Sequence, residues 1–120
     1  MKLNKLTKEE EYVIKNKGTE KPFTGHLLNN KESGIYICAQ CGAKLFNSKT
    51  KFDSGTGWPS FTDANMKNIE LKDDNELGMH RIEVICKKCK AHLGHLFNDG
   101  PSSSGKRYCI NSVCLNFKKK

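Results

Sequence analysis

Short runs in which β-prone hydrophobic residues alternate with polar ones follow one another from residue 34 onward. The clearest runs are residues 34–38, 81–86 and 107–117, and they are separated by segments rich in Gly, Asp, Asn, Pro and Ser. Runs of this length between turn-forming residues are typical of strands. The pattern predicts a mainly β domain in which the strands pair antiparallel.

The first residues follow a helical pattern instead. Thr7 can cap a helix because its hydroxyl accepts a free N–H group, and the acidic residues after it suit the positive end of the helix dipole. The apolar residues Tyr12, Val13 and Ile14 come next, and Gly18 follows as a stop signal. We expect a short helix that begins after Thr7 and ends near Gly18.

Length and composition limit the class of protein. The 120 residues suffice for one domain, which we place at residues 6–117, followed by a basic tail at residues 118–120. Hydrophobic residues make up 36% of the chain, so the core is thin enough for a metal ion to matter. We find neither a signal sequence nor a stretch of ~20 apolar residues, and we expect a cytoplasmic protein that does not enter the membrane.

The chain is basic, with 21 Lys and Arg residues against 13 Asp and Glu residues and a net charge of +8. Such a charge suits nucleic acid or an acidic protein, so a zinc-ribbon module that binds nucleic acid is an alternative function. The lysines are scattered, however, with small groups only at residues 87–90 and 118–120. Solvated surface charge explains them better, and we expect no nucleic-acid partner.

Four of the six cysteines form two Cys-x-x-Cys pairs, Cys38 with Cys41 and Cys86 with Cys89. Each pair closes a predicted strand, and Gly42 eases the turn after the first pair. Four thiolates with this spacing suit tetrahedral zinc and leave no coordination position open for a substrate. The pattern predicts a structural zinc site, with a pair of redox dithiols or a rubredoxin-like iron site as the alternatives.

The other two cysteines, Cys109 and Cys114, remain available for chemistry. We expect residues 107–117 to form one strand. Alternation along it places Arg107 and Asn111 on the same face as Cys109, while Cys114 points to the opposite face. A guanidinium favours the thiolate, which is the nucleophilic form of cysteine, and a carboxamide can donate a hydrogen bond to a reacting group. A buried cysteine beside a solvated arginine is the structural alternative.

Two histidines, His92 and His95, can supply protons near neutral pH. Because they are three residues apart, they face opposite ways in a regular strand unless a bulge at Gly94 brings them to one face. A packed histidine or an extra metal ligand explains the pair equally well. The remaining histidines, His26 and His80, have no partner pattern, and we expect them in surface or structural positions.

Two aromatic residues are candidates for the wall of a pocket. Trp58 lies between Gly57 and Pro59, on irregular backbone where a large ring can line a site for an apolar group, although it suits the core equally well. Phe97 is more typical of a core residue, but it could add to the same wall.

Three motifs taken together resemble the B-type peptide-methionine (R)-S-oxide reductases: KFDSGTGWPSF at residues 51–61, AHLGHLFNDGP at residues 91–101 and RYCINS at residues 107–112. The resemblance covers about residues 6–117 and includes the four-cysteine site. It implies a fold of two antiparallel sheets stapled by zinc. It also implies an oxidoreductase that repairs proteins after oxidative stress by reducing methionine R-sulfoxide, a stereochemistry that we carry over from the family.

The resemblance also assigns roles to individual residues. It implies that Cys109 is the nucleophile and passes through a sulfenic acid. Trp58 would hold the substrate methyl group. The side chains expected around the sulfoxide oxygen, next to Arg107, are those of His92, His95 and Asn111.

Thr56 departs from part of the family, in which a resolving cysteine stands at this position between the two glycines. Cys114 is then the only internal candidate for recycling. In a regular strand it lies roughly 16 Å from Cys109, whereas disulfide α-carbons are about 4.4–6.8 Å apart. We expect Cys114 to be an inert, packed thiol. The reductant would be an external thiol, either thioredoxin or glutathione with glutaredoxin. A zinc-held redox sensor that reacts without turning over is the remaining alternative.

Overall fold

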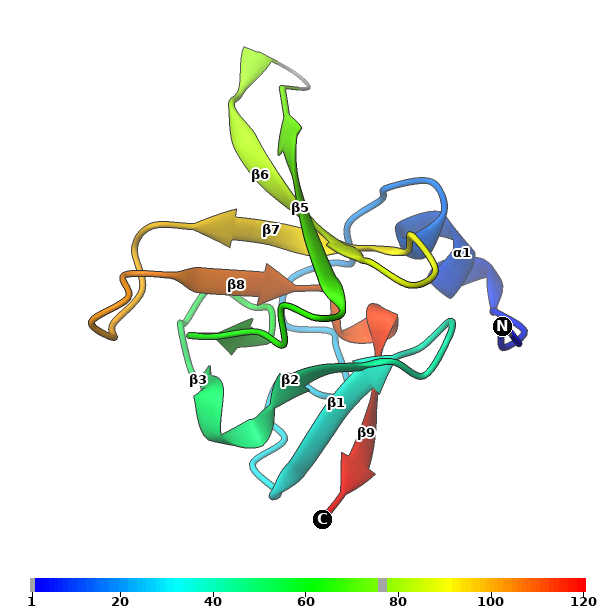
Figure 1. Cartoon of the computed structure of the whole chain (residues 1–120), viewed down its shortest axis with the longest axis horizontal. Coiled ribbons are helices and arrows are strands. Elements are labelled where there is room, and N and C mark those ends of the chain that lie inside the picture. The colour runs from blue at the N-terminus through cyan, green and yellow to red at the C-terminus, as the bar shows by residue number, and fades with distance from the viewer. Residues whose placement is uncertain (1, 76–77) are drawn as a thin grey trace.

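The computed structural model describes residues 2–75 and 78–120 and contains one short helix followed by two antiparallel sheets (Figure 1). The helix is α1 (Lys8–Ile14). The strands and short 3-10 helices follow in this order: β1 (Gly34–Cys38), β2 (Lys44–Asn47), η1 (Ser48–Thr50), β3 (Lys51–Phe52), β4 (Ser60–Phe61), β5 (Ile69–Asp74), β6 (Arg81–Cys86), β7 (His92–Phe97), β8 (Arg107–Ile110), η3 (Ser112–Cys114) and β9 (Leu115–Lys119).

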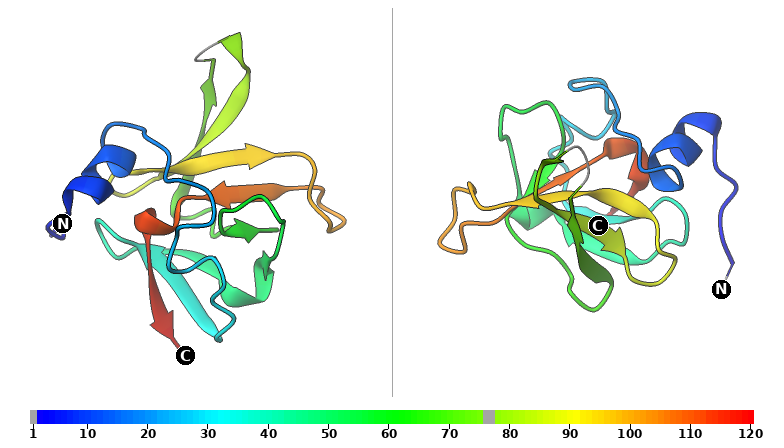
Figure 2. Two further views of the ribbon diagram at one scale, coloured as in Figure 1. Left: turned by 180° about the vertical axis from the view of Figure 1, so that it is seen from behind. Right: turned by 90° about the horizontal axis from the view of Figure 1, so that it is seen from above.

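The sheets divide the chain unequally. The smaller sheet has the order β2-β1-β9, and the larger has the order β3-β4-β8-β7-β6-β5. The strand pairs of the described residues are antiparallel, which confirms the mainly β class and the two predicted sheets. Figure 2 shows α1 beside the sheets at one end of the molecule. Within the part of the chain that the structure describes, no helix is long and apolar enough to cross a membrane.

The helix begins where the sequence predicts. Thr7 accepts the N–H group of Glu10 with its side chain, and the Glu10 side chain accepts the N–H group of Thr7, so two otherwise unpaired donors are satisfied. The helix ends at Ile14, one turn earlier than expected. Its buried residues are Val13 and Ile14, which join the core, whereas Tyr12 is exposed.

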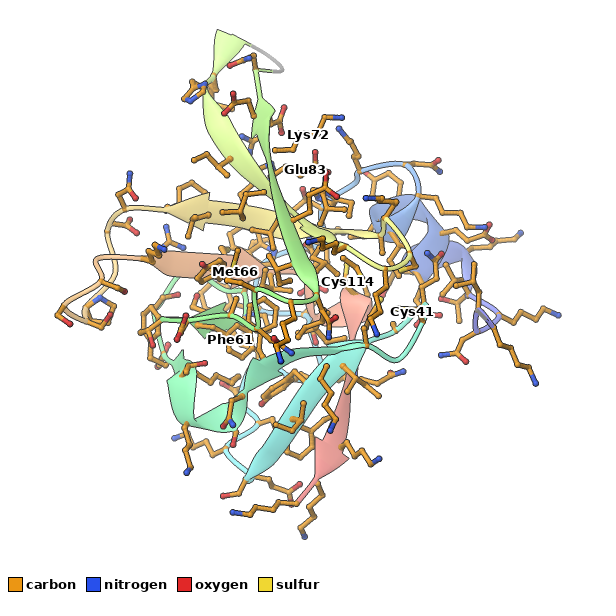
Figure 3. All side chains as sticks on the ribbon, in the orientation of Figure 1. Cys41, Phe61, Met66, Lys72, Glu83 and Cys114 are labelled. Carbon is orange, nitrogen blue, oxygen red and sulfur yellow. The ribbon has the colours of Figure 1, made fainter. Side chains whose placement is uncertain are left out.

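The core lies between the sheets and is built largely from aromatic rings. Phe61, labelled in Figure 3, stacks on Phe46 with 4.4 Å between ring centroids and meets Tyr36 edge-on at 5.2 Å. Tyr108 from β8 packs against Phe46 at 5.9 Å. Because these rings come from both sheets, they fix how β8 lies against the smaller sheet.

The prediction of one strand over residues 107–117 is wrong. The chain leaves the larger sheet after Ile110, passes through η3, and enters the smaller sheet as β9. The Glu20 carboxylate accepts the N–H group of Val113 at 3.0 Å, and the Ser112 hydroxyl accepts that of Leu27 at 2.9 Å. These partners lie far away in the sequence, so local alternation does not reveal the break.

The expected basic tail is also part of the smaller sheet. Lys118 and Lys119 pair with Ile35 and Gly34 of β1 as the last residues of β9. They are exposed, so their charges stay in solvent while their backbone forms part of the edge strand of the sheet.

Candidate functional site

Cys109 lies in β8, directly opposite His95 of β7 on one side and Ser60 of β4 on the other. Directly opposed residues in antiparallel strands point to the same face, with Cβ atoms about 4.5–5.5 Å apart. The sheet register therefore places a thiol beside an imidazole. Cys109 is half-buried, so its sulfur remains reachable from solvent.

A bulge brings the two histidines together. Val84 pairs with Gly94, but the next residue, Ile85, pairs with His92, so β7 contains one extra residue at this point. The rings of His92 and His95 lie 5.5 Å apart, which confirms the predicted bulge. Gly94 also permits the close approach of β7 to β8, because a Cβ atom there would collide with the Cys109 carbonyl group.

A small pocket of about 100 Å³ opens beside Cys109. The lining residues include six that the sequence singled out and two that it did not: Trp58, Gly94, His95, Phe97, Cys109 and Asn111, then Thr19 and Arg81. Trp58 donates its indole N–H to the Glu20 carbonyl oxygen at 3.0 Å, which fixes the ring. Trp58 and Phe97 thus belong to a pocket wall, and the alternative of core packing is wrong for both.

Arg107 joins this pocket to the loop that precedes β8. Its guanidinium donates to both carboxylate oxygens of Asp99, at 2.7 and 3.2 Å, and lies 4.5 Å from the centre of the Phe97 ring. Hydrogen bonding from Arg107 lowers the pKa of Asp99. The side chain also interacts with the Cys109 sulfur. The guanidinium is therefore held rigidly beside the thiol.

Burial raises the pKa of the Cys109 thiol above its usual value, while the charge and hydrogen bond of Arg107 lower it. The Thr56 hydroxyl also hydrogen-bonds the sulfur and lowers the pKa, whereas the nearby Glu20 raises it. Arg107 thus acts in the expected direction but does not outweigh desolvation. Desolvation therefore opposes formation of the thiolate that the sequence suggests.

His95 is held from the side opposite Cys109. Its Nε2 atom lies 2.8 Å from Oδ2 of Asp74, a buried carboxylate at the end of β5. Arg81, which pairs with Asp74 across the hairpin, approaches the same oxygen to 3.7 Å. The carboxylate fixes the orientation of the imidazole, as a partner to a proton-transferring histidine commonly does.

His92 does not line the pocket. It is buried behind His95, and its Nδ1 atom lies 2.7 Å from the Glu83 carboxylate, which in turn lies 3.1 Å from the Lys17 ammonium. Burial lowers the pKa of His92 even though Glu83 acts to raise it. The His92 ring therefore lies beside the His95 ring and outside the lining of the pocket at Cys109.

Asn111 occupies the point where β8 ends and links three segments. Its amide donates to the Leu93 carbonyl oxygen at 3.0 Å and accepts the N–H group of Glu20 at 3.1 Å. Only one N–H of the carboxamide then remains for a ligand. Glu20 is buried, and desolvation raises the pKa of its carboxyl group, while N–H groups of the turn after Asn111 lower it.

The sequence did not identify several residues that support the site: Thr19, Glu20, Asp74, Arg81, Glu83 and Asp99. In a chain with 28% charged residues, isolated acids are indistinguishable from surface charges. The sequence predicted a strand at residues 81–86 but no partner strand before it, so it could not pair Asp74 with Arg81. His26 and His80 are exposed and lie outside the pocket lining, as expected.

The four Cys-x-x-Cys sulfurs form a second site where the two sheets meet. All four Sγ atoms lie within 4.8 Å of one another, with Cys38 3.6 Å from Cys89 and Cys41 3.6 Å from Cys86. Cys38 ends β1 of the smaller sheet, and Cys86 ends β6 of the larger one. Figure 3 shows Cys41 at the turn after β1, close to the turn after β6.

The donor set fits a tetrahedral metal ion. Sulfurs about 2.3 Å from zinc are about 3.8 Å apart, close to the separations found here. Hydrogen bonds from neighbouring thiols lower the pKa of Cys86 to about 5, whereas burial raises that of Cys41 to about 11. Four thiols packed this closely share their protons unevenly, and a bound dication relieves this by accepting all of them as thiolates.

Larger hollows lie elsewhere on the surface. One of about 380 Å³ lies on the outer face of the smaller sheet and is lined mainly by isoleucines and lysines. It contains neither a nucleophilic cysteine nor an aromatic ring on which a base could stack. The basic residues of this face therefore give no support to the nucleic-acid alternative.

Comparisons with known proteins agree with the geometry. Residues 6–119 match the SelR domain. A peptide methionine sulfoxide reductase MsrB from Methanosarcina barkeri is 59% identical over 114 residues, which cover 94% of this chain and 80% of the relative. The human methionine-R-sulfoxide reductase B2, mitochondrial, is 52% identical over 122 residues, covering 95% of this chain and 67% of the relative. The chain therefore belongs to the SelR-domain family of MsrB enzymes.

Proposed function

We propose that this protein reduces methionine R-sulfoxide in proteins and peptides to methionine, with Cys109 as the nucleophile. The observation that carries the proposal is the pocket itself, in which the Cys109 thiol stands directly opposite His95 and next to Trp58. A nucleophile, a proton donor and an apolar wall within one small hollow are the parts that sulfoxide reduction needs. The family relationship supports the same reaction.

The reaction balances without a further cofactor at the pocket. The Cys109 sulfur loses its proton and takes the sulfoxide oxygen, while a proton reaches that oxygen from His95. The methionine sulfur gains two electrons and leaves as a thioether, and Cys109 becomes a sulfenic acid. The proton that the Cys109 thiol gives up restores His95. Attack and proton transfer are therefore coupled.

Each remaining residue of the predicted site has a role in this scheme. Trp58 and Phe97 hold the methyl group of the substrate, and the free N–H of Asn111 contacts the sulfoxide oxygen. Arg107 stabilises the developing thiolate. His92 acts through His95, whose ring it supports from behind.

The first test is the choice between sulfoxide epimers. When Trp58 holds the methyl group, the sulfoxide oxygen can reach His95 in only one configuration. We expect multiple turnovers of a methionine-R-sulfoxide peptide with dithiothreitol and less than about 1% of that rate on the S epimer. Trp58→Ala is expected to raise KM about tenfold or more with a smaller loss in kcat, because burial of the methyl group and its neighbouring carbons is lost.

Tyr12→Ala provides a control for this test, since Tyr12 is an exposed aromatic residue of α1 outside the pocket. It should leave both epimer preference and KM unchanged. Equal rates on the two epimers would refute the arrangement of Trp58 and His95. Failure to turn over any sulfoxide would instead favour the alternative of a redox sensor.

We also propose that the four-cysteine site holds a structural zinc ion. The ligands are the two Cys-x-x-Cys pairs, and a closed set of four thiolates leaves no position for substrate. The bound ion supplies no chemistry to the reaction and instead fixes the ends of β1 and β6 to each other. Metal analysis of the purified protein distinguishes bound zinc from the two alternatives, bound iron and a metal-free pair of redox dithiols.

We propose that an external thiol recycles Cys109. Cys114 is fully buried, and its thiol donates to the His92 carbonyl oxygen at 3.1 Å. Burial raises the pKa of Cys114 well above the usual value, so its nucleophilic form is suppressed. Because η3 interrupts the strand, the spacing of a regular strand does not give the distance between Cys109 and Cys114. Burial and the hydrogen bond now support the same conclusion.

Mass spectrometry after one equivalent of methionine sulfoxide tests this route. We expect a sulfenic acid on Cys109, trapped by dimedone, and no Cys109–Cys114 disulfide. Cys114→Ser should keep both its first turnover and its steady-state rate within about twofold. A variant that kept the first turnover but lost thioredoxin-driven cycling would make Cys114 the resolving residue and overturn the proposal.

We also propose the reductant, the domain organisation and the substrates of the enzyme. Thioredoxin, or glutathione with glutaredoxin, supplies the two thiols that convert the sulfenic acid to thiol, with release of water. Residues 6–117 act as a single reductase domain in a cytoplasmic monomer. The MsrB relatives support the proposal that the substrates are oxidised proteins.

A further inference from the structure

We infer that Phe23 is a recognition residue that contacts the side chain next to the oxidised methionine in a polypeptide substrate. The partner is an apolar or aromatic residue adjacent to methionine sulfoxide in a flexible segment of protein. The inference rests on the proposed function and extends it from the methionine side chain to the surrounding sequence.

The first observation is an unfavourable backbone conformation. Residues 21–24 form a turn in which the Thr24 N–H group and hydroxyl both donate to the Lys21 carbonyl oxygen. Pro22 occupies the second position, where its ring suits the turn, and Phe23 occupies the third with φ of +67°. A positive φ at the third position normally calls for glycine or asparagine, since a Cβ atom is strained there. The sequence nevertheless carries a phenylalanine.

The second observation is exposure. Phe23 is 68% exposed, more than any other large hydrophobic side chain that the structure describes. Its backbone N–H group donates to the Gly57 carbonyl oxygen at 2.7 Å, and its ring lies against the Cα atom of Gly57. Glycine at position 23 could make the same N–H bond, so the bond does not explain the ring. Most of the aromatic surface instead faces solvent.

The third observation is position. Gly57 directly precedes Trp58, and Thr19 of the same incoming segment lines the pocket. The indole N–H of Trp58 donates to Glu20, three residues before Phe23. The ring therefore lies against the residue that precedes Trp58, outside the pocket lining and next to its Trp58 side. The pocket itself, at about 100 Å³, has room for little more than the sulfoxide side chain.

The path of a bound polypeptide determines which of its side chains meets Phe23. Once the sulfoxide side chain enters the pocket, the main chain of the substrate lies at its rim, and the neighbouring side chain points along the rim. On the Trp58 side it meets Phe23. An exposed ring held rigidly by a turn favours an apolar or aromatic contact, which loses little entropy on binding. Free methionine sulfoxide has no neighbour and gains nothing from Phe23.

The test compares two pentapeptides, in which methionine R-sulfoxide is flanked on both sides by leucine or by glycine. The wild-type enzyme is expected to favour the leucine peptide about fivefold in kcat/KM, as suits one exposed contact. Phe23→Gly should bring this ratio to about one, and its thermal midpoint should not fall because the backbone strain is relieved. Phe23→Tyr, which keeps the ring, should retain the preference.

Leu3→Gly is the matched control, since Leu3 is 50% exposed and its neighbour Asn4 bonds to the turn of the first cysteine pair, not to the pocket. It should keep the fivefold ratio. If Phe23→Gly lowers both peptides equally, the ring only supports the Trp58 loop, and the inference is overturned. If wild-type enzyme shows no preference, it is likewise overturned. If wild-type enzyme reduces neither peptide, it is the proposed function that fails.

Discussion

Cys109→Ser is expected to reduce multiple turnover by about 1,000-fold or more while leaving the fold and the metal content unchanged. A serine hydroxyl in the same position is a far weaker nucleophile and cannot form a sulfenic acid, so the covalent step is lost rather than slowed. The position tolerates serine structurally, because Cys109 is only half-buried and neighbours the hydroxyl groups of Thr56 and Ser60.

Steady-state assays with dithiothreitol measure this loss, and circular dichroism and metal analysis establish that the variant is folded. Thr56→Ser serves as a control that alters the same surroundings but keeps a hydroxyl near the sulfur. It should retain activity within a few-fold. If Cys109→Ser kept more than a few per cent of wild-type turnover, another group would have to be the nucleophile.

Cys86→Ser is expected to release the metal and leave the protein unfolded at or slightly above room temperature. Structural zinc contributes on the order of 10 kcal/mol to the folding of small domains. The free energy of unfolding of a whole domain is about 5–15 kcal/mol, so a lost ligand endangers the entire structure. Cys86 is fully buried at the end of β6, and its loss also separates the two sheets at that point.

Thermal unfolding and metal content measure this effect, and Cys109→Ser is the matched control because it removes a cysteine outside the cluster. That variant should retain one zinc ion for each chain. Activity of Cys86→Ser should fall in parallel with its folded fraction, not independently of it. A metal-free protein that stayed folded and fully active would show that the cluster has no architectural role.

Features that depend on local sequence were predicted well. The cap at Thr7 starts α1, and the runs at residues 34–38 and 81–86 became β1 and β6 with the expected bounds. Each of these depends on a few neighbouring residues whose propensities agree. The clustering of the two cysteine pairs also agrees with the prediction, since each pair forms a local turn and the four sulfurs meet at one place.

Features that depend on distant partners were not predicted. The strand after Cys109 breaks because Glu20 and Leu27 form hydrogen bonds with the turn at residues 112–114. The sequence of that turn does not indicate these partners. The support of His95 by Asp74 needs the register of three strands. The pKa of Cys109 depends on burial, which alternation along a strand cannot measure. The sequence thus predicted most of the residues that meet at the pocket, but not the contacts that hold them in place.

The crossing of the chain from the larger sheet to the smaller one also determines when the fold can be completed during synthesis. β9 completes the smaller sheet by pairing with β1, which leaves the ribosome about 80 residues earlier, at roughly 5–20 residues each second. Until the last residues emerge, β1 lacks that neighbour and the ring of Phe117 is missing from Tyr36. All six cysteines precede β9 in the chain, so every thiol of the protein is synthesised before the smaller sheet can be completed.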